Sequence, residues 1–164
     1  MSVRSIGAFL LCLVMTLAAT HSANASDDTP SRQSLVALNN ICVVVALTGA
    51  QAQAGFNEST FQTDVELKLR SAGLTVPNES SKCDAWLFVC IGALHKRPNE
   101  RVAFRTDLLL QQNVLLARDP SSQVMGTTWF VGGVGTGDLE YIRKLIRDNT
   151  DQFFNAWLSP IRPS

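Results

Sequence analysis

The residue in this chain best suited to acid–base chemistry near neutral pH is His95. The chain has two histidines, and the other lies in an N-terminal segment that we expect to be removed. A catalytic triad would join His95 to a nucleophile, one of many serines or Cys90, and to an acid such as Asp107. However, two basic residues follow His95 at the end of an expected strand, which favours a solvated turn residue. We therefore predict no catalytic residue, and a small hydrolase or transferase with a site near His95 is the alternative hypothesis.

Metal ligands and paired carboxylates are sparse. Zinc sites need three or four converging His, Cys or acidic ligands, and the chain contains neither Cys-x-x-Cys nor His-x-x-x-His. Asp64 and Glu66 lie two positions apart on an expected helix, so their side chains point in different directions. Asp148 and Asp151 lie three positions apart and could share a helix face. We predict solvated carboxylates, no metal and no cofactor.

A glycine-rich segment, Gly132–Gly137, precedes Asp138, which is a good helix N-cap. Glycines ahead of a helix can hold a phosphate through backbone N–H groups. This segment completes neither Gly-x-Gly-x-x-Gly nor the Walker lysine pattern, and it follows the last expected strand. It therefore predicts a flexible bend between strand and helix. An anion would bind at Gly135, Gly137 and the Asp138 N–H, against repulsion by the Asp138 carboxylate. This bend is the other place where the alternative enzyme site could lie.

Three cysteines, Cys42, Cys83 and Cys90, lie beyond the N-terminal apolar run. In an oxidising compartment an odd number allows one internal bridge and leaves one thiol. If Ala85–Leu94 is a strand, Cys83 and Cys90 lie more than about 20 Å apart, which excludes a bridge between them. A bridge between Cys42 and Cys90 fits two neighbouring apolar strands better. Free buried thiols remain the other interpretation.

Hydrophobic periodicity predicts two helices and a set of strands. The first helix begins at the capping box Ser59 and Gln62, buries a stripe that includes Phe61 and Val65, and ends before Gly73. The second runs over Leu139–Leu158. The expected strands are Ile41–Leu47, Leu74–Val76, Ala85–Leu94, Arg101–Arg118 and Val124–Val131.

These elements follow one another as β-α-β-β-β-β-α, which predicts an α+β fold with a single mixed sheet and two helices packed on one face. Ile41–Leu47 is continuously apolar, so we expect it to be covered on both faces. Arg101–Arg118 alternates instead. Val102, Phe104 and Leu108 share one face, while Arg105 and Asp107 share the other, as in a half-solvated antiparallel strand.

The N-terminus predicts export. Arg4 is followed by the apolar run Ile6–Ala19, and Ala23-Asn24-Ala25 gives the small-x-small pattern that signal peptidase cleaves. The run is shorter than the roughly 20 residues of a membrane span. We therefore divide the chain into a signal peptide, 1–25, a flexible lead, 26–33, and one domain, 34–164. The cleaved chain is expected in the periplasm or medium, with no integral membrane segment.

The net charge excludes several classes of partner. The chain has 14 basic and 14 acidic residues, and of these only Arg4 precedes the predicted cleavage. Nucleic-acid binders and polybasic membrane-surface proteins carry a clear positive excess. We therefore expect neither nucleic acid nor an anionic lipid surface as the partner.

Several segments resemble a family of small, exported, uncharacterised bacterial proteins. They are Phe61–Leu74, Thr127-Thr128-Trp129 with the glycine segment, and Asp151–Leu158. More distantly, the element order is similar to the N-terminal domain of TolB and to LpoB- or CsgG-like periplasmic domains, and this resemblance implies docking or assembly in the cell envelope. The chain lacks the lipidated cysteine of the lipoprotein members.

Together these features predict an exported, non-catalytic module that docks an envelope protein. It would use an exposed strand edge or the polar face of Arg101–Arg118. The two alternatives to this docking module are the small hydrolase or transferase described above and a small-ligand carrier.

Overall fold

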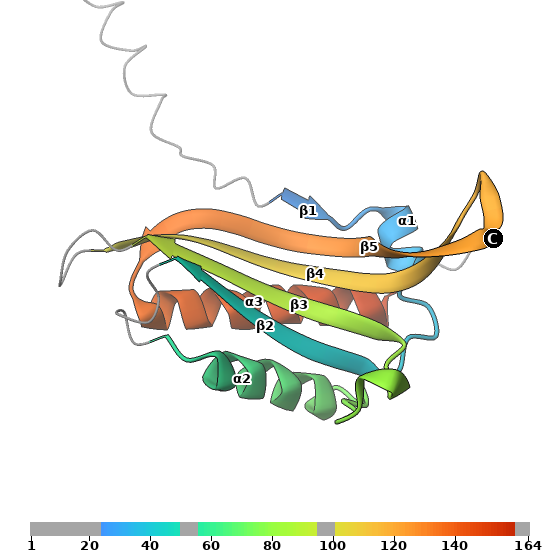
Figure 1. Ribbon diagram of the computed structural model, residues 1–164. Coiled ribbons are helices and arrows are strands. Elements are labelled where there is room, and N and C mark those ends of the chain that lie inside the picture. The colour runs from blue at the N-terminus through green and yellow to red at the C-terminus, as the bar shows by residue number, and fades with distance from the viewer. Residues whose placement is uncertain (1–23, 50–55, 95–100, 160–164) are drawn as a thin grey trace, which may run out of the picture.

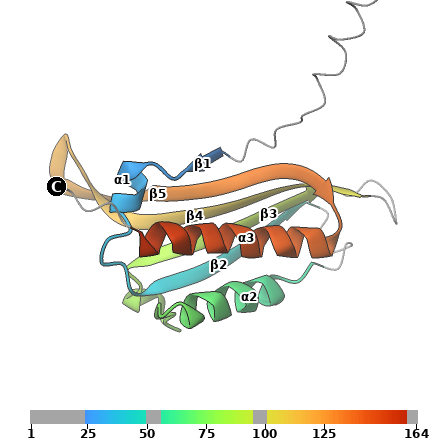
Figure 2. The ribbon, with the colours of Figure 1, turned by 180° about the vertical axis from the view of Figure 1, so that it is seen from behind.

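The computed structural model describes residues 24–49, 56–94 and 101–159. They form one mixed sheet in the order β1-β5-β4-β3-β2, and α2 and α3 both cover the same face of it (Figures 1 and 2). This arrangement confirms the predicted α+β fold. The elements are β1 (Asn24–Ser26), α1 (Thr29–Gln33), β2 (Ile41–Gly49), α2 (Glu58–Ser71), the 3-10 turn η2 (Ser80–Lys82), β3 (Ala85–Leu94), β4 (Val102–Leu116), β5 (Asp119–Gly137) and α3 (Leu139–Leu158).

β2 and β3 are parallel, and every other pairing in the sheet is antiparallel. The predicted strand Leu74–Val76 is wrong, because it is reduced to one isolated bridge between Asn40 and Thr75. Its backbone bonds are those of Ile41 N to Thr75 O, 2.9 Å, and of Thr75 N to Asn39 O, 3.0 Å. Pro77 has no N–H to donate, so the ladder cannot continue past this point.

The N-cap of α2 lies two residues before the predicted one. The Asn57 side chain accepts the Ser59 N–H at 2.9 Å and the Ser59 hydroxyl at 2.8 Å, so Asn57 is the N-cap and Ser59 is helical. The expected buried stripe is confirmed for Phe61, Val65 and Leu69. Gly73 follows the helix with φ +93°, the left-handed conformation expected of a C′ glycine.

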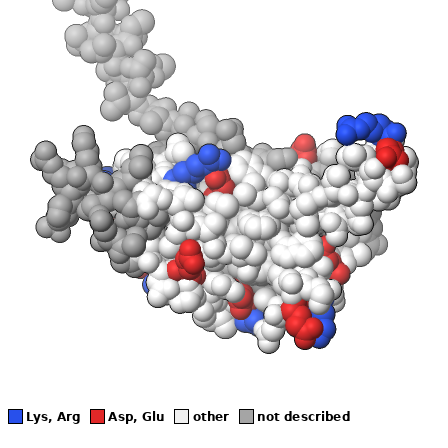
Figure 3. Space-filling model, in the orientation of Figure 1, with Lys and Arg blue, Asp and Glu red and all other residues white. Residues whose placement is uncertain are grey.

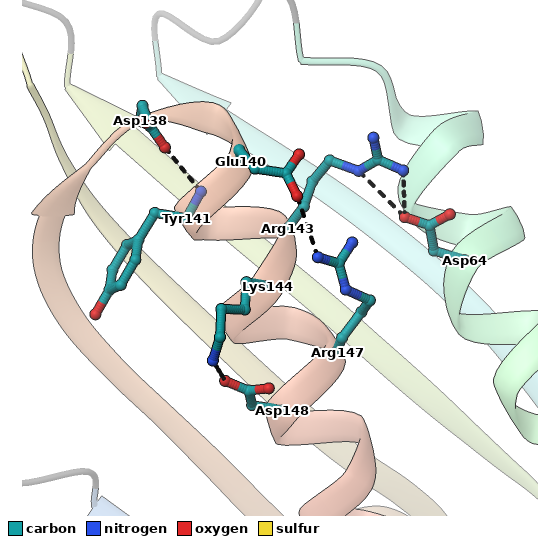
Figure 4. Close-up of polar contacts among 8 residues, drawn as sticks. All are labelled: Asp64, Asp138, Glu140, Tyr141, Arg143, Lys144, Arg147 and Asp148. Atoms are coloured by element: carbon teal, nitrogen blue, oxygen red, sulfur yellow. Dashed lines mark hydrogen bonds and ion pairs between the residues drawn. The ribbon is translucent and has the colours of Figure 1, made fainter.

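α3 begins where the sequence places it. The Asp138 carboxylate accepts the Tyr141 N–H at 2.8 Å and caps the helix, as predicted (Figure 4). The helix buries Ile142, Ile146 and Phe153 against the sheet. The rings of Phe153 and Trp129 meet edge to face with centroids 5.2 Å apart, which ties the helix to β5.

The segment 26–33, which we expected to be a flexible lead, is packed against the sheet. It contains the short helix α1, and Arg32 binds the Asp27 carboxylate through two nitrogens at 2.9 and 2.7 Å. The indole N–H of the buried Trp129 donates to Asp27 at 3.4 Å. Leu35, just beyond α1, is fully buried. The lead is ordered because its polar residues find partners on the sheet and its apolar neighbour enters the core.

The glycine segment is not the bend that we predicted. β5 continues through it to Gly137, with Gly135 opposite Phe104 and Gly137 opposite Val102 on β4. A Cβ at Gly135 would come within 3.0 Å of the Phe104 ring, and one at Gly137 within 2.5 Å of the Tyr141 ring. These glycines therefore let aromatic rings lie directly on the strand.

The disulfide joins Cys42 to Cys83, with their Cα atoms 5.7 Å apart, so both alternatives considered for Cys42, a bridge to Cys90 and a free thiol, are wrong. The register explains the outcome, because Cys42 lies opposite Trp86 whereas Cys90 lies opposite Ala46, further along both strands. Cys83 follows η2, just ahead of β3, and reaches back to the start of β2. Cys90 keeps a free thiol.

Candidate functional site

The face of the sheet turned away from α2 and α3, here called the open face, carries a row of apolar side chains. Val44, Phe88, Leu109 and Phe130 lie opposite one another on four successive strands, and each is half-buried. The expectation that β2 is covered on both faces is therefore wrong, because no described helix lies over this face (Figures 1 and 2). Figure 3 shows the open face as mainly uncharged, with a few isolated charged side chains.

A single ion pair interrupts this apolar surface. In the neighbouring row, Cys90 lies opposite Asp107, and Asp107 lies opposite Gly132. Asp107 is only 7 % exposed, and its carboxylate accepts from Arg105 Nε at 2.6 Å, while the Arg105 side chain is 68 % exposed. The Asp107 carboxylate lies where a Cβ of residue 132 would be, which explains the glycine there. The buried charge is thus compensated by a guanidinium that faces solvent.

The free thiol beside this pair is poorly suited to nucleophilic chemistry. Burial raises the pKa of Cys90, and the Asp107 carboxylate raises it further, while Arg105 opposes the change. The thiolate is the reactive form of cysteine, so the local environment keeps Cys90 protonated near neutral pH. The sequence-based constellation of Cys90 with Asp107 therefore exists in space, but its electrostatics are the reverse of those of an activated nucleophile. His95, its proposed base, lies outside the described residues.

A shallow hollow of about 370 Å³ adjoins the ion pair. It forms where Thr48, Gly92, Arg105 and Val134 lie opposite one another in that order, so two small residues on β2 and β3 lie beside one cation on β4 and one exposed valine on β5. Its volume is at the lower end of the range for small-molecule sites. Among the residues described, Arg105 is the charged group in its wall.

The carboxylates on α3 are engaged in separate ion pairs. Asp148 binds the Lys144 ammonium on the same helix, whereas Asp151 binds Lys68 of α2 (Figure 4 shows the first). The two acids share no ligand or cation. Within the described ranges, no group of three or more His, Cys, Asp or Glu residues could hold a metal ion.

A second interhelix contact accounts for Asp64. Its carboxylate accepts from Arg143 Nη2 at 2.7 Å and from Nε at 3.2 Å, which joins α2 to α3 (Figure 4). Glu66 points elsewhere and pairs with Arg70 at 3.0 Å. The different directions of Asp64 and Glu66 agree with the helical spacing.

The anion position that we considered at the glycine segment is not formed. Gly135 and Gly137 lie inside the β4–β5 ladder, and the Asp138 carboxylate itself occupies the start of α3 through the Tyr141 N–H. An incoming anion would have to displace that carboxylate against charge repulsion.

Sequence reasoning missed the apolar row on the open face. The signal for it was present, because Ile41–Leu47 and Ala85–Leu94 are apolar at both alternating positions, while two helices suffice for one face of the sheet. A continuous apolar strand in such a sheet must leave apolar side chains on the uncovered face.

Comparison with known proteins gives a likeness in fold alone. No family model matches the chain, and no curated protein matches it. A point variant of PelC from Paraburkholderia phytofirmans, solved as a dodecamer, is 13% identical with a TM-score of 0.46 over 72% of this chain and 88% of that chain.

Two further solved structures match the chain at similarly low identity. A second crystal form of the Paraburkholderia phytofirmans PelC dodecamer is 16% identical, with a TM-score of 0.39 over 77% of this chain and 88% of that chain. A protein described as uncharacterised is 13% identical, with a TM-score of 0.38 over 71% of this chain and 88% of that chain. In the part of the chain that the structure describes, no helix is long and apolar enough to cross a membrane.

Proposed function

We propose that this chain is an exported, non-catalytic docking module whose open face binds a protein partner. The observation that carries the proposal is the apolar row formed by Val44, Phe88, Leu109 and Phe130, which no described helix covers (Figure 1). The four side chains are half-buried and together reach the surface of the open face, and contiguous accessible apolar surface on a small domain marks an interaction site. We include in this proposal that the chain is related to small exported bacterial proteins and, more distantly, to TolB-, LpoB- or CsgG-like envelope domains.

The polar groups of the open face support contact rather than chemistry. Arg105 and Asp107 are paired with each other, and the Cys90 thiol stays protonated beside them. A partner that covers the face buries apolar side chains and meets one ion pair near the centre. This ion pair can discriminate between partners, because a partner surface that moves Arg105 away would leave the buried Asp107 carboxylate without its counter-ion.

Export with cleavage after Ala25 is the second part of the proposal. The Cys42–Cys83 bridge supports it, because disulfides persist in oxidising compartments and are rare in the cytosol. Cell fractionation followed by intact-mass measurement tests it. We expect a periplasmic or secreted chain that starts at Ser26 and contains one disulfide. A cytoplasmic chain that retains its first residues would refute this part.

Docking is tested by site-specific photocrosslinking in cells. A photoreactive phenylalanine replaces Phe88 in the centre of the apolar row, and a matched control replaces Leu67, which is 59 % exposed on α2. We expect a discrete crosslinked protein from position 88 and none from position 67. Equal crosslinking from both positions, or none from position 88, would contradict the proposal.

The hollow beside Arg105 favours a small-ligand carrier as the second candidate function, since its volume of about 370 Å³ suits a small molecule. Native mass spectrometry of the protein purified from its own cells separates the two functions. A bound metabolite without a crosslinked protein would replace docking with carriage.

A further inference from the structure

The outer edge of β5 is only partly covered. β1 pairs with it through Asn24 opposite Gly132, Ala25 opposite Val131 and Ser26 opposite Phe130. Among the described residues, nothing pairs with Gly133–Gly137 on the side away from β4 (Figure 1). A β-strand edge of this kind presents unpaired N–H and C=O groups to any extended chain.

The proposed cleavage after Ala25 passes through β1 itself. Removal of the residues up to Ala25 takes away the partners of Gly132 and Val131 and leaves only Ser26 opposite Phe130. The free edge then runs without interruption over Val131–Gly137. This step rests on the proposed function, because it requires the signal peptide to be cut there.

The sequence of this edge carries none of the usual protection. Natural edge strands are guarded by charged side chains, prolines or short length. From Ser121 to Gly137 the strand contains no charged residue and no proline. Val134, at the centre of the free edge Val131–Gly137, is the most exposed of the large apolar side chains in the described part of the chain, at 71 %.

We propose that a second copy of this chain pairs with the first through this edge, β5 antiparallel to β5, about a twofold axis at Val134. The segment Val131–Gly137 is centred on Val134, so two identical edges cover each other completely in that register. The two Val134 side chains meet on the open face, and glycines flank them at Gly133 and Gly135. Isologous pairing of this type closes as a dimer.

The charges at the two ends of the paired segment are complementary. In this register the pairing ends with Gly137 of the second copy opposite Val131, so Asp138 of that copy comes next to Ser26, which pairs with Phe130. Cleavage after Ala25 makes Ser26 the amino terminus, so a new ammonium group meets a carboxylate at each end. No like charges face each other along the edge between them.

The test uses purified chain starting at Ser26, with its Cys42–Cys83 bridge intact. Sedimentation velocity is compared for the parent, for Val134→Lys and for the control Leu67→Lys, which changes an exposed residue on α2. Opposed lysines at the twofold axis repel each other, so we expect Val134→Lys to raise the dimer dissociation constant at least about tenfold. Leu67→Lys should dimerise like the parent. Unchanged thermal unfolding shows that each variant is folded.

A crosslink fixes the register. In a Cys90→Ser background, Val134→Cys places two thiols directly opposite each other, within the range that a disulfide can bridge. We expect rapid formation of a covalent dimer on oxidation, and at least about tenfold less from Leu67→Cys in the same background. A monomeric parent, a dimer that survives Val134→Lys, or no excess crosslinking at position 134 would each overturn the proposal.

The tests of dimerisation are independent of the test of export. The N-terminus found in cells decides where the precursor is cut, whereas these measurements use a chain whose start is chosen. A chain that starts at Ala23 retains Asn24 and Ala25 and should dimerise more weakly than the chain that starts at Ser26. Equal dimerisation of the two chains would refute the role of cleavage in freeing the edge.

Discussion

Reduction of the Cys42–Cys83 disulfide should destabilise the fold strongly. The bridge closes a loop with a sequence separation of 41 residues, and loop-closure entropy then predicts a loss of about 4 kcal/mol from the free energy of unfolding at 25 °C. For a domain of this size, that corresponds to a fall in Tm of about 10–15 °C. The bridge also joins the start of β2 to the turn before β3, so its loss should first loosen the parallel pair of strands.

The assay compares urea unfolding of the oxidised chain with that of the same chain after reduction and alkylation. Cys90→Ser is the matched control, since Cys90 carries a free thiol and its replacement should leave the difference unchanged. Peptide mapping of the oxidised chain should give a Cys42–Cys83 peptide and an alkylated Cys90. A difference below about 1 kcal/mol between the oxidised and reduced chains, or a peptide that joins Cys42 to Cys90, would refute the reasoning.

Three further predictions test the packing and the electrostatics. Gly132→Ala should lower the free energy of unfolding in urea by about 1–3 kcal/mol, because its Cβ would overlap the Asp107 carboxylate and come within 2.9 Å of a backbone oxygen. In the control Gly133→Ala the new Cβ meets nothing within 4 Å, so the free energy of unfolding should change by less than about 0.5 kcal/mol. The alkylation rate of Cys90 should reach its plateau at a higher pH than that of free cysteine, because burial and the Asp107 carboxylate raise the pKa of the thiol. Asp107→Asn should move the midpoint of this pH–rate curve to lower pH, and an unmoved midpoint would contradict the role assigned to the carboxylate. Asn57→Ala should lower the free energy of unfolding by about 1 kcal/mol, because Asn57 is the N-cap of α2, and a loss of less than a few tenths would favour the predicted cap Ser59, two residues later.

The parts of the fold that the sequence predicts are those fixed by periodicity. Phe61, Val65 and Leu69 repeat at helical spacing, and all three are buried. The alternation of Arg101–Arg118 places Val102 and Phe104 on the helix-covered face, as expected. These elements are determined locally, since a one-residue shift turns every side chain of a strand to the opposite face and rotates the side chains of a helix by about 100°.

The parts that the sequence does not predict depend on register between distant segments. Cys42 bonds to Cys83 because the parallel register of β2 and β3 puts the start of both strands together, and no local pattern encodes that register. The glycines of β5 were interpreted as a bend because glycine is common in bends. Their actual requirement is the space taken by the Phe104 and Tyr141 rings and by the Asp107 carboxylate, all of which come from other elements.

The same distinction applies to the candidate site. Each of Phe88, Leu109 and Phe130 could be assigned to a strand from the sequence, but their alignment in one row follows only from two strand registers, β3 with β4 and β4 with β5. The row, the Arg105–Asp107 pair and the free edge of β5 all lie on the side of the sheet that α2 and α3 leave uncovered or at its border.

Pairing through the β5 edge would therefore affect binding at the open face. A second copy paired through Val134 would extend the sheet across the twofold axis, and both open faces would then form one continuous surface on the same side. A partner that binds the apolar row would meet two copies of Phe130 flanking that axis, and the strength of its binding would depend on dimerisation. Conversely, Val134→Lys would weaken partner crosslinking from position 88 only through loss of the dimer, because Val134 lies two rows away from Phe88 in the sheet. Crosslinking that persists unchanged in this monomeric variant would separate the two surfaces.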